Sequence, residues 1–305
     1  FRMLFFFPQR IYGIMINEAL VAVPLFIFMG VMLEKTKIAS KLLESIGDLF
    51  GSIRGGLGIG VVLVGMLLAA STGIVGATVV TMGMLALPSM LKAGYDEKIA
   101  TGTICAAGTL GQIIPPSIVL ILLAEMLQGA NEEAGLLTGD LAPLPVTAID
   151  LFAGALFPGL LLVFLYLSYQ IIIAFINPSS SPPLVSHQEN NDEDTNVFDL
   201  IKIISAPLIL IIIVLGSILT GIATPTESAA VGAVGATVIA IVSNQFTFQI
   251  LKTVSQETTK ISSMVFIILI GASMFSLVFR GFGGDIVVEE FLMNLPGGAI
   301  SAMLI

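Results

Sequence analysis

The fold of this chain depends on residues 57–91, which read LGIGVVLVGMLLAASTGIVGATVVTMGMLALPSML. These 35 residues carry no charge, whereas one helix crosses a bilayer with roughly 20 apolar residues. The run is therefore too long for one crossing and too short for two crossings joined by a turn. Small, polar and glycine residues gather at its middle, in ASTGIVG at 70–76. We predict a re-entrant hairpin of two half-length helices that meet at a polar tip, because backbone that leaves a helix at membrane depth must face protein or water.

A second interrupted apolar run follows at residues 108–121, which read GTLGQIIPPSIVLI. It contains two glycines and the pair Pro115-Pro116, and proline both removes a backbone donor and disrupts a helix. Two interrupted segments in succession indicate a binding site near the membrane midplane of a secondary transporter. The alternative is that each interruption is only a kink.

Composition assigns the whole chain to the membrane. Hydrophobic residues make up 56% and charged residues 11% of the 305 residues, and the mean hydropathy is +1.04, whereas soluble domains carry about 25% charged residues. The alternating pattern of a transmembrane barrel is absent, so we predict an all-α polytopic membrane protein surrounded by the lipid bilayer. The net charge of −9 argues against a nucleic-acid partner. Cys105 and His187 are single residues of their kinds, which excludes a disulfide framework and a His/Cys metal cluster.

The order of apolar and polar stretches predicts five parts. These are a scaffold helix with an amphipathic arm (1–56), the hairpin and broken helix (57–127), a periplasmic loop and scaffold helix (128–176), a cytoplasmic linker (177–199) and a second repeat (200–305). Lys92 and Lys98 flank the hairpin, whereas residues 128–147 hold no Lys or Arg. The positive-inside rule therefore places the hairpin base in the cytoplasm and residues 128–147 outside.

An internal repeat is predicted from the order of these elements. A spanning helix, an amphipathic stretch ending in Gly-Gly and an apolar run occur first around 17–91 and again from 261 onward. The first copy runs inward and the second outward, and such inverted repeats are typical of secondary transporters. The chain starts without methionine and stops at Ile305 where the second hairpin would begin. We therefore expect truncation at both ends and a second hairpin beyond Ile305.

Oxygen atoms at the two interruptions form the predicted ion site. Interrupted helices free backbone carbonyls, and Na⁺ accepts carbonyl and hydroxyl oxygens without needing a carboxylate. The predicted sodium ligands are Ser71, Thr72, Gly73, Gly108, Thr109, Gly111 and Pro115. Helix amino ends favour anions, and the predicted substrate-binding residues are Gly76, Thr78, Pro116 and Ser117. The alternative for the hydroxyl residues is ordinary packing of small side chains between membrane helices.

Glu227 lies in the turn Thr224-Pro225-Thr226-Glu227 between two apolar segments. An acid at membrane depth is a candidate functional residue. The same four residues also fit a capping turn, with a Thr cap, Pro at the first helical position and an acid near the helix start, and this structural role is the one we predict. The chain contains no Walker motif, G-x-S-x-G or H-E-x-x-H, so an enzyme and an organic cofactor are not expected.

Four stretches in this order resemble the large membrane subunit of tripartite ATP-independent periplasmic (TRAP) transporters. They are ALPSMLKAGY (86–95), GTLGQIIPPSIVLI (108–121), DLFAGALFPGLLL (150–162) and GIATPTESAA (221–230). The resemblance implies an elevator-type sodium symporter of the bacterial inner membrane that takes up an organic acid. It also implies a small membrane subunit and a soluble periplasmic binding protein as partners.

The resemblance implies one sodium site between the hairpin tip and residues 108–117, and a second site beyond Ile305. The first tip of the family commonly reads like S-G-S-A-V-A-D, whereas residues 71–77 here read STGIVGA. The acid is absent, so no carboxylate ligand is expected at this tip. The competing hypothesis is a non-transporting membrane scaffold or assembly subunit, which accounts for the apolar composition but not for the paired broken helices.

Overall fold

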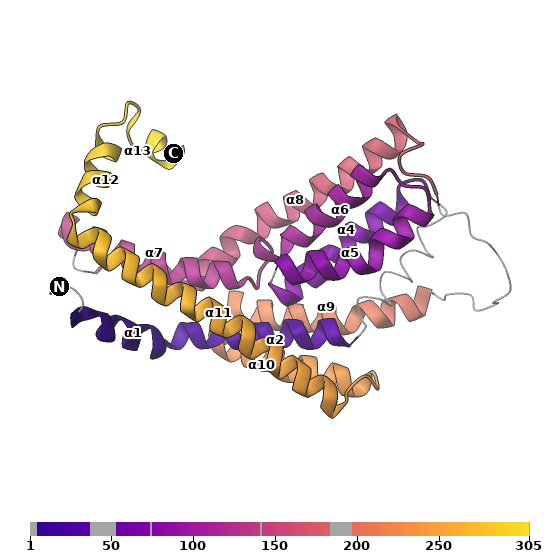
Figure 1. The fold of residues 1–305 in the computed structure, drawn as a ribbon, viewed down its shortest axis with the longest axis horizontal. Helices are drawn as coiled ribbons and strands as arrows, with labels where there is room; N and C mark the ends of the chain where they lie inside the picture. Colours follow the sequence, from indigo (N-terminus) through magenta and orange to yellow (C-terminus); the bar gives the residue numbers. More distant parts are fainter. Residues whose placement is uncertain (1–4, 37–52, 74, 141, 184–196, 305) are drawn as a thin grey trace. The chain divides into compact units, whose positions relative to one another are not determined.

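The computed structural model describes residues 5–36, 53–73, 75–140, 142–183 and 197–304, and among them it is entirely helical (Figure 1). The all-α prediction is therefore confirmed. The chain forms two compact units, one of residues 19–259 and one that combines residues 1–18 with residues 260–305. The elements of each unit are described separately below.

The larger unit contains the hairpin, the broken helix and the helices around them. Its elements are η2 (Glu18–Val21, at the boundary), α2 (Ala22–Lys35), α4 (Gly56–Thr72), α5 (Val75–Lys92), α6 (Glu97–Thr109), η3 (Leu110–Gln112), α7 (Ile118–Thr138), α8 (Ala148–Ile176), α9 (Val197–Leu219), α10 (Pro225–Val242) and the first part of α11 (Phe248–Gly281). The smaller unit holds α1 (Phe7–Met15), the end of α11, α12 (Gly284–Met293) and α13 (Gly298–Leu304).

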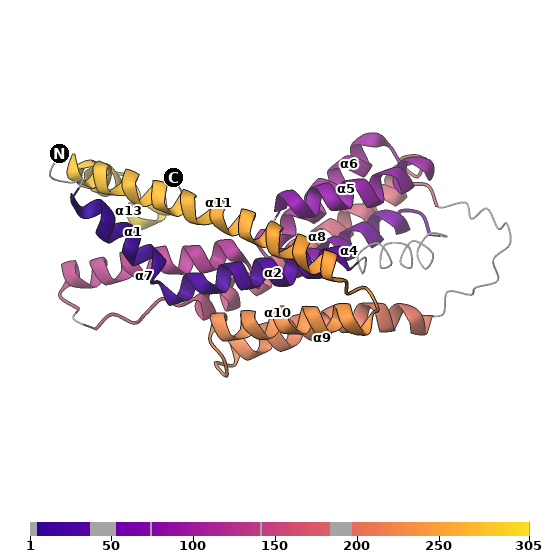
Figure 2. The same ribbon diagram turned by 60° about the horizontal axis from the view of Figure 1, so that its bottom comes forward.

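Two groups of helices pack within the larger unit. Helices α4, α5 and α6 lie side by side, and α2 packs along α10, which in turn packs on α9 (Figures 1 and 2). A buried cluster joins α4 to its surroundings through Val62 of α4, Leu110 and Ile114 of the break, Val163 of α8 and Ile211 of α9. The broken helix therefore lies against the hairpin and is enclosed by α8 and α9.

Three of the described helices are long and apolar enough to cross a membrane: α8, α10 and α11. A fourth span results if α1 and residues 18–35 are counted together. The 29-residue helix α8 has a mean hydropathy of 2.3 over its best window, with only 22% of that window buried inside the protein. Such apolar and exposed helices need lipid around them, so the chain is a multi-pass membrane protein.

The structure corrects three predicted boundaries. Residues 128–138 continue helix α7 and are not part of a loop, and α11 begins at Phe248, well before the predicted start at Ile261. Helices α4 and α5 have 17 and 18 residues, about 26 Å each, so they are longer than the predicted half-length. The amphipathic stretch after α2 and most of the acidic linker fall within 37–52 and 184–196, outside the described residues.

Glycine allows the hairpin to approach α6 closely. A Cβ built on Gly65 of α4 would lie 2.6 Å from Cβ of Ala107, closer than real Cβ contacts. A Cβ built on Gly83 of α5 would instead meet open space, with nothing within 4 Å. Small residues let membrane helices pack at short distance, so Gly65 has a packing role that Gly83 does not share.

We predict opposite effects for alanine at these two glycines. Gly83→Ala should preserve or raise thermal stability in detergent, because alanine favours a helix by about 1 kcal/mol over glycine. Gly65→Ala should lower stability by about 1–3 kcal/mol, since the added methyl overpacks the contact with Ala107. Thermal unfolding of both variants measures this, and equal behaviour of the two would contradict the packing role.

Candidate functional site: the hairpin tip and the broken helix

The tip of the hairpin is a tight reversal between α4 and α5. Helix α4 ends at Thr72, Gly73 is buried with a φ of +59°, and α5 begins at Val75. A positive φ is easily adopted only by glycine, which explains why the helix stops here. Ile74 and the side chains of Ser71 and Thr72 lie outside the described part of the chain. The last carbonyls of α4 have no partner within the helix, so oxygen atoms are available at this tip.

The helix after the hairpin is broken, as predicted. Helix α6 ends at Thr109, a short 3₁₀ turn follows, and α7 starts only at Ile118. The peptide bond between Pro115 and Pro116 is cis. Ser117 is the N-cap of α7: its hydroxyl accepts from Leu120 N–H at 3.4 Å and donates to the carbonyl of Gln112 at 2.9 Å. The interruption is therefore an ordered, buried turn with its own hydrogen bonds.

Gln112 joins the two interruptions. Its Nε2 donates a hydrogen bond of 2.9 Å to the carbonyl oxygen of Gly73. Its Oε1 is buried and has no hydrogen-bond partner among the residues that the structure describes. A Cβ on Gly73 would lie 3.4 Å from Cγ1 of Ile118 at the start of α7, so the tip also packs against the far side of the break. Sequence reasoning overlooked Gln112, although a long polar side chain inside an apolar run is a signal.

The structure separates the predicted sodium ligands into two groups. Gly73 and Gly111 are buried where the tip meets the break. Gly108 instead packs against Val79 in α5, where a Cβ would be too close. The hydroxyl of Thr109 is exposed and donates to Ala106 of its own helix at 2.8 Å. In this arrangement the Thr109 hydroxyl is engaged within its own helix.

The predicted substrate residues also differ in their surroundings. Thr78, Pro116 and Ser117 are buried, and the hydroxyl of Ser117 is engaged in capping α7. Gly76 is exposed, with open space around it. Both helix amino ends, that of α5 and that of α7, are next to the interruptions, where free amides and the helix dipole favour an anion.

The base of the hairpin is fixed to the start of the linker. Gly55 N–H donates to Ser181 O and Asp96 N–H donates to Ser180 O, each at 3.0 Å. Tyr95 lies between these points and its hydroxyl accepts from Gly58 N–H at 3.3 Å. Burial raises the pKa of Tyr95 above its ordinary value, so this hydroxyl stays neutral. The two sides of the hairpin base are thereby joined to the start of the linker, which is far away in sequence.

Glu227 has the capping role that was predicted. The Glu227 carboxylate accepts from Thr224 N–H at 2.8 Å, and the Thr224 hydroxyl accepts from Glu227 N–H at 3.2 Å. Pro225 occupies the first turn of α10, and the Glu227 side chain is exposed. This reciprocal capping box stabilises the start of α10 and removes Glu227 from the candidate ion ligands.

The described residues contain no group of three or more His, Cys, Asp or Glu side chains that could hold a metal ion. The donor set at the tip is instead made of neutral oxygens, namely backbone carbonyls and the Gln112 Oε1. Such hard, neutral oxygens suit a weakly bound alkali cation better than a transition metal.

We predict that Gln112→Leu loosens the tip. The change removes the bond to Gly73, which is worth about 1 kcal/mol, and amide exchange in a peptide covering 69–76 should accelerate about fivefold. Gln249→Leu, at an exposed glutamine of α11, is the matched control and should leave exchange unchanged. Unaltered exchange in Gln112→Leu would show that the bond does not hold the tip.

Comparison with known proteins identifies the family. Residues 2–305 match the model of the tripartite ATP-independent periplasmic transporter, DctM component. The C4-dicarboxylate TRAP transporter large permease protein DctM of Pseudomonas aeruginosa is 32% identical over 263 residues, 86% of this chain and 56% of the relative. The DctM of Vibrio cholerae is 34% identical over 218 residues, 72% of this chain and 43% of the relative.

The ectoine TRAP transporter large permease protein TeaC of Halomonas elongata is 28% identical over 262 residues, 85% of this chain and 56% of the relative. The chain thus spans about half the length of the curated relatives it matches. These relatives are transporter permeases and not enzymes. The chain belongs to the DctM family of tripartite ATP-independent periplasmic transporter components.

Proposed function

We propose that this chain forms part of a sodium-coupled secondary transporter that takes up an organic acid across the bacterial inner membrane. The observation that carries the proposal is the meeting of two interrupted helices, joined by the hydrogen bond from Gln112 to Gly73. Backbone that leaves the helix at membrane depth is tolerated only where it is enclosed by protein or lines a wet cavity. Paired interruptions of this kind form the ion and substrate sites of secondary transporters.

Sodium is the proposed coupling ion, and the donor set supports it. The carbonyls at the end of α4 and the orphaned Oε1 of Gln112 are oxygen donors without a formal charge. A cation that binds them gains electrostatic energy and would also satisfy the buried Oε1 of Gln112. Ser71 and Thr72 supply hydroxyls at the same point of the chain.

An organic acid is the proposed substrate class because the amino ends of α5 and α7 lie next to the interruptions. The relatives are named for different substrates, namely C4-dicarboxylate, ectoine and sialic acid. The family pattern further supports a small membrane subunit and a periplasmic binding protein as partners. It also supports an elevator movement of the hairpin-bearing part, in which two inverted repeats contribute one interrupted helix pair each.

Sodium binding at the tip predicts a specific effect of hydroxyl removal. Ser71→Ala or Thr72→Ala should raise the sodium concentration that half-saturates uptake, because each change deletes a candidate ligand. Uptake is measured in liposomes that contain the full transporter, with its binding protein added. Ser168→Ala removes a hydroxyl that bonds only Phe164 of its own helix at 2.7 Å and should behave as wild type. Unchanged sodium dependence in both tip variants would refute this site, and absence of uptake by the wild type would favour the scaffold hypothesis.

The positive-inside rule predicts the orientation of the hairpin. A cysteine at Lys98, exposed at the start of α6, should react with an impermeant thiol reagent only after the membrane is opened. A cysteine at Leu136, which is 74% exposed at the end of α7, should react in intact cells. The exposed Cys105 is replaced in both variants. The reverse labelling pattern would overturn the proposed topology.

A further inference from the structure

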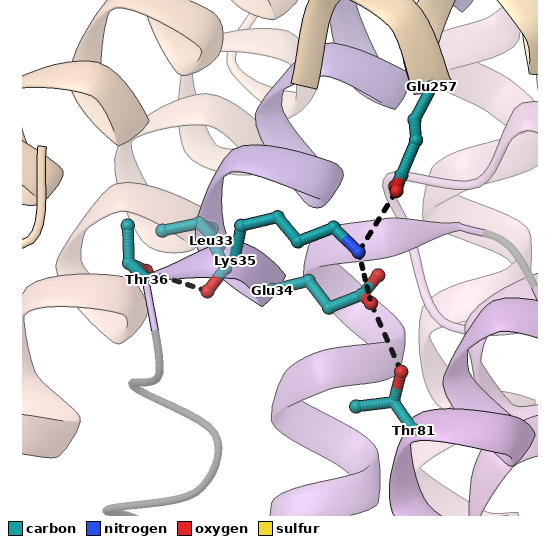
Figure 3. Close-up of polar contacts among 6 residues, drawn as sticks. All are labelled: Leu33, Glu34, Lys35, Thr36, Thr81 and Glu257. Atoms are coloured by element: carbon teal, nitrogen blue, oxygen red, sulfur yellow. Dashed lines mark hydrogen bonds and ion pairs between the residues drawn. The ribbon is translucent and has the colours of Figure 1, made fainter. Parts of the chain in front are cut away.

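A cluster of four polar side chains connects the hairpin to two helices outside it (Figure 3). Glu34 and Lys35 are consecutive residues at the end of α2. The Thr81 hydroxyl of α5 donates to Glu34 Oε1 at 3.1 Å. The Lys35 ammonium lies 3.1 Å from Glu257 Oε1 in α11 and 3.6 Å from Glu34 Oε1. Because consecutive helical residues point about 100° apart, the end of α2 reaches the hairpin with one side chain and α11 with the next.

The charges of this cluster depend on one another. Two carboxylates share the single ammonium of Lys35, so the four groups carry a formal charge of −1. The Glu34 side chain is only 14% exposed, so water contributes little to its solvation. Removing one partner from a poorly solvated charge is costly, because the remaining charge is left uncompensated. The Glu34 carboxylate therefore favours the hairpin position that places the Thr81 hydroxyl within reach.

The hairpin contacts its neighbours in two chemically different ways. Against α6 it packs through small residues, with Gly65 facing Ala107 and Gly108 facing Val79. These close contacts fit the hairpin tightly against α6. Toward α2 the contact at Thr81 is a directional hydrogen bond. A shift of about 5.4 Å, one helical turn, would break this hydrogen bond, which adds to the packing of α2 against α4 of the hairpin.

The hydrogen bond between Thr81 and Glu34 lies well away from the base of the hairpin. Thr81 lies eleven residues before Lys92, the last residue of α5, which corresponds to about 16 Å of helix. The contact is made at the very end of α2. The base of the hairpin consequently extends past the end of α2, as the ribbon also shows (Figure 1). The contact therefore joins the middle of α5 to the end of α2.

From these observations we infer that Glu34, Lys35, Thr81 and Glu257 form a latch that holds the hairpin and α6 in the position at which Thr81 meets the end of α2. Glu34 and Lys35 are positioning residues that set how much of the protein occupies this position, and they do not bind the transported ion or substrate. The inference rests on the proposed function in one respect, since a latch of this kind requires the hairpin to move during transport.

The latch is tested by spin-label distances in the full permease in lipid nanodiscs. Labels are placed at Met84 of α5 and Val238 of α10, which are 68% and 50% exposed, with Cys105 and any other native cysteine replaced. Loss of the latch should create or enlarge a second distance population. Glu34→Gln and Lys35→Met should each change the ratio of the two populations by about fivefold, the equivalent of one partly exposed ion pair.

Matched variants distinguish loss of the latch contacts from a nonspecific effect of substitution on the fold. Thr81→Val removes the hydroxyl that donates to Glu34 and should also shift the distribution, whereas Thr81→Ser keeps the hydroxyl and should retain the wild-type distribution. Thr101→Val removes an exposed hydroxyl that bonds Glu97 of its own helix at 2.7 Å and should change nothing. The exchange Lys35→Glu with Glu257→Lys restores an opposite-charge pair between α2 and α11 and should move the distribution back toward wild type if Lys35→Glu alone alters it.

Transport provides the second measurement. The latch variants should change the maximal uptake rate several-fold and leave the half-saturating sodium concentration within twofold of wild type. An unchanged distance distribution in Lys35→Met, or an equal change in Thr101→Val, would overturn the latch. If the wild type shows no sodium dependence while the latch variants still shift the distances, the sodium proposal fails and the latch stands.

Discussion

The requirement that backbone polar groups be satisfied inside an apolar environment governs this structure. Helices α4 and α6 both stop within apolar runs, and each stop frees carbonyls that lipid cannot satisfy. The two stops therefore meet, and the Gln112 amide donates to the Gly73 carbonyl where they touch. At the other end of the break, the Ser117 hydroxyl caps α7 by accepting from Leu120 N–H and donates to the Gln112 carbonyl. Among the described residues at this meeting point, the Oε1 of Gln112 is a buried acceptor without a hydrogen-bond partner.

The sequence predicted the interruptions because their causes are local. Glycine at 73 and the proline pair at 115–116 act on the backbone wherever they occur, and the capping turn at 224–227 depends on residues three apart. The family resemblance added the order of elements over most of the chain. By contrast, residues 128–138 looked like a loop because they are polar, yet they continue α7. The polarity of a stretch indicates whether its residues are exposed, but it is a poorer guide to whether they form a helix or a loop.

The contacts between distant residues could not be predicted in this way. Gln112 and Gly73 are 39 residues apart, and Thr81 and Glu34 are 47 apart, so no period or spacing relates them. Glu257 likewise gives no sign in the sequence that it pairs with Lys35 of α2. Such pairs depend on how the helices pack, which is set by many small contacts at once.

The polar contacts within the larger unit differ in charge according to what they join. Inside the body formed by the hairpin, α6 and α8, they are neutral: Gln112 bonds Gly73, and the buried Gln170 bonds Thr103 at 2.7 Å. At the end of α2 they are charged. A neutral hydrogen bond between membrane helices costs little desolvation and fits a permanent contact, whereas a charge pair is favourable only while its partners stay close. The contacts that join the hairpin and α8 to the broken helix are therefore neutral, and the charged contact lies where the end of α2 meets α5 and α11.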